Sequence, residues 1–159
     1  MATIHLMVGF MGFGKTTVAE RLAEELPAVC LTHDHYMATL YGRNLPETEF
    51  RQKYDIIDNI LWQLAAKIIK CNTDVIMDYG FWSKEKRAQA YQRALNITPN
   101  VIFHNVLCHM ETAKQRLLNR SKNDSAALDI DEACFDLFAK QYQPMDNTEN
   151  YPVINHENF

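Results

Sequence analysis

GFMGFGKTT, residues 9–17, follows a short apolar run, TIHLMV, at residues 3–8. The stretch from Gly9 to Thr16 satisfies the pattern G-x-x-x-x-G-K-[ST] in full. An apolar run that ends in glycines is typical of a buried parallel strand leading into a tight turn. The small residues let successive backbone N–H groups converge on a polyphosphate, and a following helix points its positive end at the same place. The stretch therefore predicts a strand–loop–helix unit that binds nucleotide phosphates.

Hydrophobic periodicity and turn residues divide the rest of the chain into alternating strands and helices. Beyond residues 3–8, we expect strands at 28–31, 75–78, 101–107 and, more weakly, 152–155. The expected helices are 15–26, a short one at 36–41, a long one over about 50–68, 83–95, 111–120 and 129–141. This alternation predicts an α/β fold with one five-stranded, mostly parallel sheet and helices on both faces. Because no repeat or linker divides the chain, residues 1–159 are predicted to form one domain.

Composition and charge narrow the class of protein. The 159 residues are 47% hydrophobic, and the net charge is −4, which disfavours a protein that holds nucleic acid by bulk charge. The four cysteines form no C-x-x-C pair, so neither a zinc site nor a disulfide framework is indicated. Glycines interrupt the apolar N-terminal run and residues 1–5 lack the basic region of a signal peptide, so we expect no membrane span and a cytoplasmic location.

Three side chains carry the expected nucleotide chemistry. Lys15 provides a point charge for the β- and γ-phosphates, and the Thr16 hydroxyl is suited to Mg²⁺. Asp78 ends an apolar strand, as does the aspartate that holds Mg²⁺ in P-loop proteins. The other predicted phosphate-binding residues are Gly9, Phe10, Met11, Gly12, Phe13, Gly14 and Thr17. The chain has no N-K-x-D motif, and Tyr79 rather than a second acid follows Asp78, which favours small kinases over GTPases and motor ATPases.

On these motifs the chain resembles the P-loop kinases, most closely the small ATP-binding kinases related to zeta toxins, chloramphenicol phosphotransferase and the kinase domain of polynucleotide kinase. The resemblance spans nearly the whole chain and rests on residues 9–17, Asp34, residues 75–87 and the sequence RLLNR at 116–120. It implies a P-loop NTPase fold with a short lid at about 116–130, in which residues 121–129 are the lid itself. It also implies the cofactors ATP and Mg²⁺ and a hydroxyl-bearing small molecule as acceptor.

The resemblance assigns roles to three further residues. Asp34 would contact the acceptor hydroxyl and take its proton, although an aspartate here could simply cap the helix at 36–41. Arg116 and Arg120, one helical turn apart, would pack on adenine and clamp the transferring phosphates, unless they form an exposed basic face. Asp78 could face the acceptor instead of Mg²⁺.

The acceptor pocket is less well defined by the sequence. Arg87 resembles a kinase arginine directed toward the site, with a solvated helix face as the alternative. Phe81 and Trp82 either lie beneath the pocket or fill the core, and we expect the core for at least one of them. The other candidates for the pocket are His35, Tyr36, Tyr41, Arg43 and Arg51.

The expected function is transfer of the γ-phosphoryl group of ATP to a small-molecule hydroxyl. A kinase of nucleic-acid 5′-hydroxyls, a toxin-like kinase of sugar nucleotides and a nucleotide-binding regulatory ATPase remain as alternatives. The sequence leaves the oligomeric state open between a monomer and a weak dimer.

Overall fold

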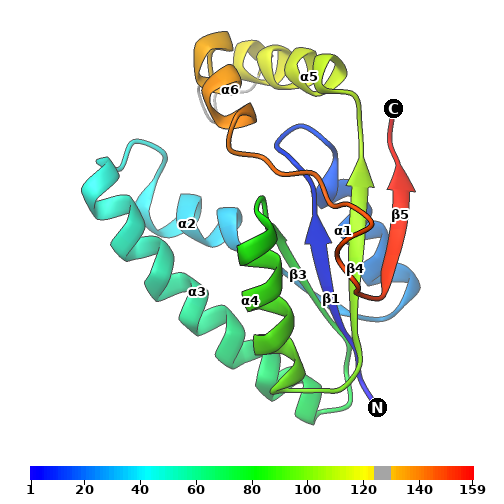
Figure 1. Ribbon diagram of the computed structural model, residues 1–159. Coiled ribbons are helices and arrows are strands. Elements are labelled where there is room, and N and C mark those ends of the chain that lie inside the picture. Colours follow the sequence, from blue (N-terminus) through cyan, green and yellow to red (C-terminus); the bar gives the residue numbers. More distant parts are fainter. Residues whose placement is uncertain (124–129) are drawn as a thin grey trace.

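The computed structural model describes residues 1–123 and 130–159, and its strands form one sheet (Figure 1). The strands are β1 (Ile4–Val8), β2 (Val29–Thr32), β3 (Val75–Gly80), β4 (Val101–Leu107) and β5 (Val153–Glu157). Their order is β2-β3-β1-β4-β5, and all four pairings are parallel. The predicted α/β class is therefore confirmed, with a fully rather than mostly parallel sheet.

Six helices occur in the described part of the chain: α1 (Lys15–Glu25), α2 (His33–Tyr41), α3 (Glu47–Lys70), α4 (Lys84–Leu95), α5 (Met110–Asn123) and α6 (Glu132–Ala139). None of the helices within residues 1–123 and 130–159 is long and apolar enough to cross a membrane.

Two hydrophobic cores cover the two faces of the sheet. On one face, Ile4, Leu6 and Val8 of β1 pack with Leu61 of α3 and Ala90 of α4. The other core contains Met7 of β1 and residues of α1, α5 and α6, including Val18, Ala113 and Phe135. Because successive side chains of a strand point to opposite faces, β1 contributes to both cores and is buried throughout. A strand buried on both faces explains why its sequence is a continuous apolar run.

Parallel strands end at the same edge of the sheet, and this edge is where the fold gathers its polar loops. Figure 1 shows α5 and α6 beyond the ends of the strand arrows, above this edge, while α3 and α4 lie beside the sheet.

Helix boundaries differ from the sequence prediction at one functionally important place. Helix α2 begins at His33, directly after β2, rather than at residue 36. Thr32 occupies the N-cap position, so Asp34 lies in the first turn of the helix and does not cap it. Ser83 does cap α4 as expected, since its side chain accepts a hydrogen bond from the Lys86 N–H.

Candidate active site

The loop between β1 and α1 has the shape that its glycines permit. Gly12 has φ of 78° and Gly14 has φ of 88°, both in the left-handed region that favours glycine. A Cβ atom on Gly12 would also come within 2.7 Å of the Ala113 carbonyl oxygen. The loop therefore needs glycine at this position both for its backbone conformation and for its close approach to α5.

Lys15 folds back over this loop, and its Nζ donates to the Phe10 carbonyl oxygen at 3.0 Å. Burial lowers the pKa of the Lys15 ammonium, while the negative charges of Asp78 and Asp34 oppose that shift. The lysine thus lies among the phosphate loop and two of the predicted site carboxylates.

Asp78 and two threonines form an oxygen-rich cluster beside Lys15. Thr16 Oγ1 and Thr32 Oγ1 donate to Asp78 Oδ2 at 2.9 and 3.1 Å. Asp78 is only 4% exposed, and burial raises the pKa of its carboxyl while Lys15 and the two hydroxyls oppose the rise. Carboxylate and hydroxyl oxygens are ligands that Mg²⁺ prefers, so Thr16 and Asp78 fit the expected metal.

Asp34 lies between this cluster and α3. Its side chain is exposed in the first turn of α2, and its charge acts on Lys15 and Asp78. It also contributes to the raised pKa of Tyr54 on α3, which is caused mainly by burial and next by Asp58. The charge of Asp34 thus acts both on the phosphate loop and on the part of α3 that carries Tyr54, although Asp34 does not line the cleft between α3 and α4.

Its neighbour His33 fixes α2 on α3. His33 is buried, its Nε2 donates to the Tyr54 carbonyl oxygen at 3.1 Å, and the two rings lie 3.8 Å apart. Burial lowers the pKa of the imidazole, so it is neutral at pH 7. This buried contact holds the helix turn on which Asp34 is exposed.

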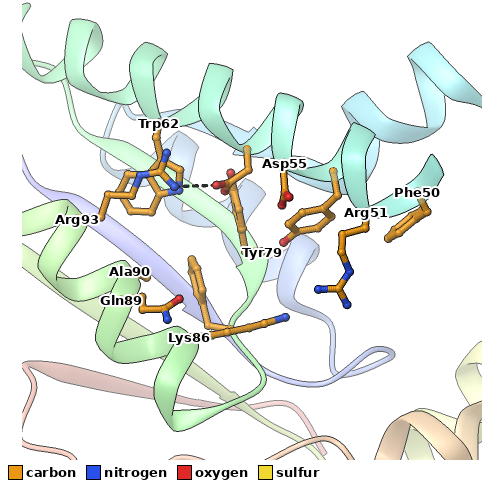
Figure 2. A pocket seen from close by; sticks show the side chains of 12 residues that line it. Phe50, Arg51, Asp55, Trp62, Tyr79, Lys86, Gln89, Ala90 and Arg93 are labelled. Carbon is orange, nitrogen blue, oxygen red and sulfur yellow. Dashed lines mark hydrogen bonds and ion pairs between the residues drawn. The ribbon is translucent and has the colours of Figure 1, made fainter. Parts of the chain in front are cut away.

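A cleft of about 360 Å³ opens between α3 and α4 next to the end of β3 (Figure 2). Its wall includes the rings of Tyr79 and Phe81, which are stacked with centroids 5.2 Å apart, and Tyr54. Phe81 has φ of 46°, an unfavourable conformation for a non-glycine residue that is common at functional sites. Phe81 lines this cleft, and the residue before it, Gly80, accepts a hydrogen bond from Gly9 of the phosphate loop, so the cleft and the loop lie near the same edge of the sheet.

The other residues predicted for the pocket are placed differently. Trp82 turns to the opposite core, where its ring lies 4.9 Å from that of Phe10. Arg51 lines the cleft, but His35, Tyr36, Tyr41 and Arg43 do not. Tyr36 and Tyr41 pack against the core on the α3 side, and His35 and Arg43 are exposed on α2 and the loop after it.

An aromatic cluster connects the phosphate loop to α6. Phe10 lies 5.2 Å from Phe135 of α6 and 5.4 Å from Tyr142, and Phe13 lies 5.7 Å from Tyr142. The apolar residues of the motif are thus anchors that hold the loop on α6 and the segment after it.

Arg116 lies beside the loop and Arg120 one turn further along α5. Arg116 Nη1 donates to the Asn158 carbonyl oxygen at 3.3 Å and reaches the Gly12 carbonyl oxygen at 3.5 Å. Arg120 is exposed. Of the predicted lid, residues 116–123 continue α5, while 124–129 lie outside the described residues.

Comparison with known proteins agrees with this geometry. The model of the AAA domain family AAA_33 matches residues 4–145. The chain belongs to this family. No curated protein matches the sequence.

Solved structures of kinases share the fold. A candidate kinase from Chloroflexus aurantiacus superposes with a TM-score of 0.73 at 18% identity, covering 98% of this chain and 88% of that one. Kti12 of Chaetomium thermophilum, in complex with ADP-AlF3, gives 0.69 at 17%, covering 97% and 88%. The APS kinase CysC of Mycobacterium tuberculosis, with AMPPNP and APS, gives 0.64 at 16%, also covering 97% and 88%. The resemblance to P-loop kinases is therefore confirmed at the level of family and fold.

Within this kinase fold, Arg87 does not have the position that the sequence predicted. It is fully buried, its Nε and Nη2 donate to Glu149, and its Nη1 donates to the Phe81 carbonyl oxygen. The arginine is neither on a solvated helix face nor a lining residue of the cleft. Its role is to hold the segment after β3, and with it the backbone of Phe81.

Two residues of the candidate site, Thr32 and Tyr54, could not be identified from the sequence. Thr32 was not singled out, because its contact with Asp78 arises only from the pairing of β2 with β3. Tyr54 belongs to the apolar stripe of α3, and nothing in a helical stripe distinguishes a cleft residue from a core residue. The sequence feature that could indicate site residues was a polar side chain near the end of a strand, and this feature identified Asp78 and Asp34.

Proposed function

We propose that this chain is an ATP- and Mg²⁺-dependent phosphotransferase that moves the γ-phosphoryl group to a hydroxyl of a small molecule bound in the cleft between α3 and α4. One observation carries the proposal. The phosphate loop and the cleft lie toward the same edge of the sheet, and the exposed carboxylate of Asp34, in the first turn of α2 and outside the lining of the cleft, acts electrostatically on Lys15 of the loop and on Tyr54 of the cleft wall.

In the proposed reaction the acceptor oxygen attacks the γ-phosphorus of ATP from the side of the cleft. The bond from that phosphorus to the bridging oxygen breaks, ADP leaves, and the hydroxyl proton passes to the carboxylate of Asp34. Lys15 and the N-terminal end of α1 stabilise the charge on the phosphates. The lid arginine Arg120 would approach the transferring group, and Arg116 would lie against the base of the nucleotide.

Mg²⁺ would be held by Thr16 and Asp78, and when bound it neutralises phosphate charge. Asp78 is committed to this cluster by its two threonine contacts, so we assign it to the metal rather than to the acceptor. Asp34 has the exposure that a proton acceptor needs, so we assign the acceptor hydroxyl to Asp34.

We treat residues 1–159 as one kinase domain with its lid at about 116–130. All four cysteines are free, which fits the cytoplasmic location expected from the sequence.

The test is transfer of label from γ-labelled ATP to a panel of nucleosides, sugars, aminoglycosides, chloramphenicol, sugar nucleotides and 5′-hydroxyl oligonucleotides. We expect label on a small molecule, and we expect Asp34→Asn to lose transfer while binding nucleotide normally. Glu47→Gln is the control, because it neutralises an exposed carboxylate at the start of α3, outside the cleft.

Two outcomes would replace the proposal. Label on oligonucleotides, with binding that weakens steeply as salt rises, would indicate a nucleic-acid kinase. Release of free phosphate at a rate that neither acceptors nor Asp34→Asn change would indicate a regulatory ATPase.

A further inference from the structure

The two ends of the cleft differ in charge. At one end the guanidinium of Arg93 has hydrogen-bond partners within the protein: Nη1 donates to Asp58 at 2.7 Å and Nη2 donates to Asn59 at 3.0 Å. The same guanidinium lies 4.8 Å from the centre of the Trp62 ring. The positive charge of Arg93 at this end of the cleft is thus neutralised by an ion pair with Asp58. Figure 2 shows the pair as a dashed contact beside Trp62.

At the other end are two cations that form no ion pair with the described residues. Arg51 of α3 and Lys86 of α4 line the cleft from opposite walls, and their side chains extend toward one another (Figure 2). Both are exposed, and neither has an ion-pair partner among residues 1–123 and 130–159. Asp55 is the one carboxylate of the lining near them.

The lining of the cleft therefore has a positive net charge, although the net charge of the whole chain is negative. It carries the cations Arg51, Lys86 and Arg93 and the anions Asp55 and Asp58, an excess of one positive charge, while the chain as a whole has a net charge of −4. A local excess of the opposite sign attracts an anion and raises its concentration at the site. An arginine and a lysine together suit a carboxylate, phosphate or sulfate group, because guanidinium binds such groups bidentately and ammonium acts as a point charge.

The wall between these two ends is aromatic. The stacked rings of Tyr79 and Phe81 and the ring of Tyr54 offer flat apolar surfaces for the body of a ligand. Burial and the nearby Asp58 raise the pKa of Tyr79, so its hydroxyl stays protonated. The ligand body thus meets apolar surface, and the unpaired positive charge is confined to the end that holds Arg51 and Lys86.

We infer that the acceptor is an organic anion, whose negative group is bound by Arg51 and Lys86 while its body rests on the aromatic wall. This inference rests on the proposed phosphotransferase function and specifies its substrate class. In this inference Arg51 and Lys86 select the acceptor, whereas the phosphate loop and Asp34 act on the phosphoryl group and the hydroxyl that take part in the transfer.

The test uses three compounds that share a phenyl ring and the gluco-pyranose ring and differ only at C6 of the sugar: phenyl β-glucoside, phenyl β-glucuronide and phenyl β-glucoside 6-phosphate. They are neutral, a carboxylate and a phosphate monoester, respectively. Dissociation constants are measured by calorimetry with Mg²⁺ and a saturating non-hydrolysable ATP analogue, so that the phosphate loop is already filled. Label transfer from ATP to each compound is measured in parallel.

We expect the anionic compounds to bind about 10- to 100-fold more tightly than the neutral one, as for hydrogen bonds to a charged group. Arg51→Gln and Lys86→Gln should each remove most of that preference and leave the neutral compound unchanged. Lys70→Gln, an exposed lysine at the far end of α3, is the control and should change neither. The two anionic compounds distinguish a carboxylate from a phosphate as the preferred group.

The inference is overturned if the neutral compound binds as tightly as the anions, if neither anion binds, or if the two variants weaken all three compounds equally. Its failure differs from failure of the kinase proposal. Label transferred to neutral acceptors alone would leave the kinase standing without the anion site, whereas loss of all transfer with every acceptor of the larger panel would remove the kinase.

Discussion

Arg87 of α4 and Glu149, which precedes β5, form a buried two-point ion pair across 62 residues of sequence. Arg87 Nε lies 2.7 Å from Glu149 Oε1, and Nη2 lies 3.0 Å from Oε2. Their side chains are 0% and 6% exposed. Because Arg87 Nη1 also binds the Phe81 carbonyl oxygen, the pair joins α4, the chain before β5 and the backbone beside the cleft.

Glu149→Ala is therefore expected to destabilise the protein by about 3–5 kcal/mol, since it leaves a buried guanidinium without its counter-charge. Urea unfolding of the two proteins measures the difference. Glu25→Ala is the matched control, because Glu25 pairs with Arg21 at 3.8 Å on an exposed face and should change stability by less than about 1 kcal/mol. Equal effects of the two substitutions would show that the buried pair has no special role.

Lys15→Ala is expected to reduce phosphoryl transfer by at least about 100-fold, as loss of one transition-state contact does. The folded protein should be little affected, because within the described residues the Lys15 ammonium donates a single hydrogen bond, to the Phe10 carbonyl oxygen. Turnover and the thermal midpoint are measured together. Lys67→Ala, an exposed lysine of α3, serves as the control, and near-normal turnover by Lys15→Ala would contradict the assigned role.

Asp78→Asn is expected to separate activity from stability. Burial raises the pKa of Asp78, so the folded state disfavours the ionised carboxylate, and a neutral amide should raise the thermal midpoint of the metal-free protein. The same change removes the charge proposed to hold Mg²⁺, so the Mg²⁺ concentration for half-maximal rate should rise. Glu47→Gln should shift neither value. A variant with an unchanged Mg²⁺ requirement would argue that Asp78 does not bind the metal.

Those features that depend on contiguous residues could be predicted from the sequence. The phosphate loop, its flanking strand and helix, and Ser83 at the start of α4 are local, because each is determined by residues within a few positions. Strand β4 also has the predicted bounds, since its sequence VIFHNVL contains no glycine or proline that would end a strand early.

Features that depend on distant partners could not be predicted. From sequence alone a charged residue on a helix is expected to face solvent. Arg87 is buried instead, because the fold brings Glu149, which is distant in the sequence, into contact with it. Phe81 and Trp82 are adjacent and both aromatic, yet the positive φ of Phe81 sends one to the cleft and the other to the opposite core. The cleft could not be predicted either, because it forms where α3 packs beside α4 and no sequence motif indicates that packing.

A chain of histidines shows the same dependence on strand pairing, and it has a consequence for stability. His5 of β1, His104 of β4 and His156 of β5 lie in a row, with 2.8 Å between His5 Nδ1 and His104 Nε2 and between His104 Nδ1 and His156 Nε2. His5 Nε2 lies 3.2 Å from the carboxylate of Asp74, which can only accept when ionised. Each neutral ring then donates through Nε2, and the Nδ1 atoms of His5 and His104 accept, so these three hydrogen bonds form without any added proton.

This arrangement predicts a loss of stability in mild acid. Burial, and then the neighbouring His5 and His156, lower the pKa of His104 to about 3, below its value of about 6.5 in an unfolded chain. Between about pH 3 and pH 6.5 the unfolded state binds more protons than the folded state. The contribution of His104 to the free energy of unfolding is therefore fully present above about pH 6.5 and decreases as the pH falls below that value. The slope should approach about 1.4 kcal/mol per pH unit, or about 2 kcal/mol between pH 6.5 and 5.

Replacing His104 by glutamine removes this titration, so the pH dependence of urea unfolding should become flatter in His104→Gln than in the native chain over the same range. His109→Gln is the control, because His109 is exposed after β4 and takes no part in the row of three rings. Its unfolding profile should follow that of the native chain. If the native chain and His104→Gln lose stability equally between pH 6.5 and 5, the row accepts a proton without penalty, and His104 is not the group whose charging opposes folding.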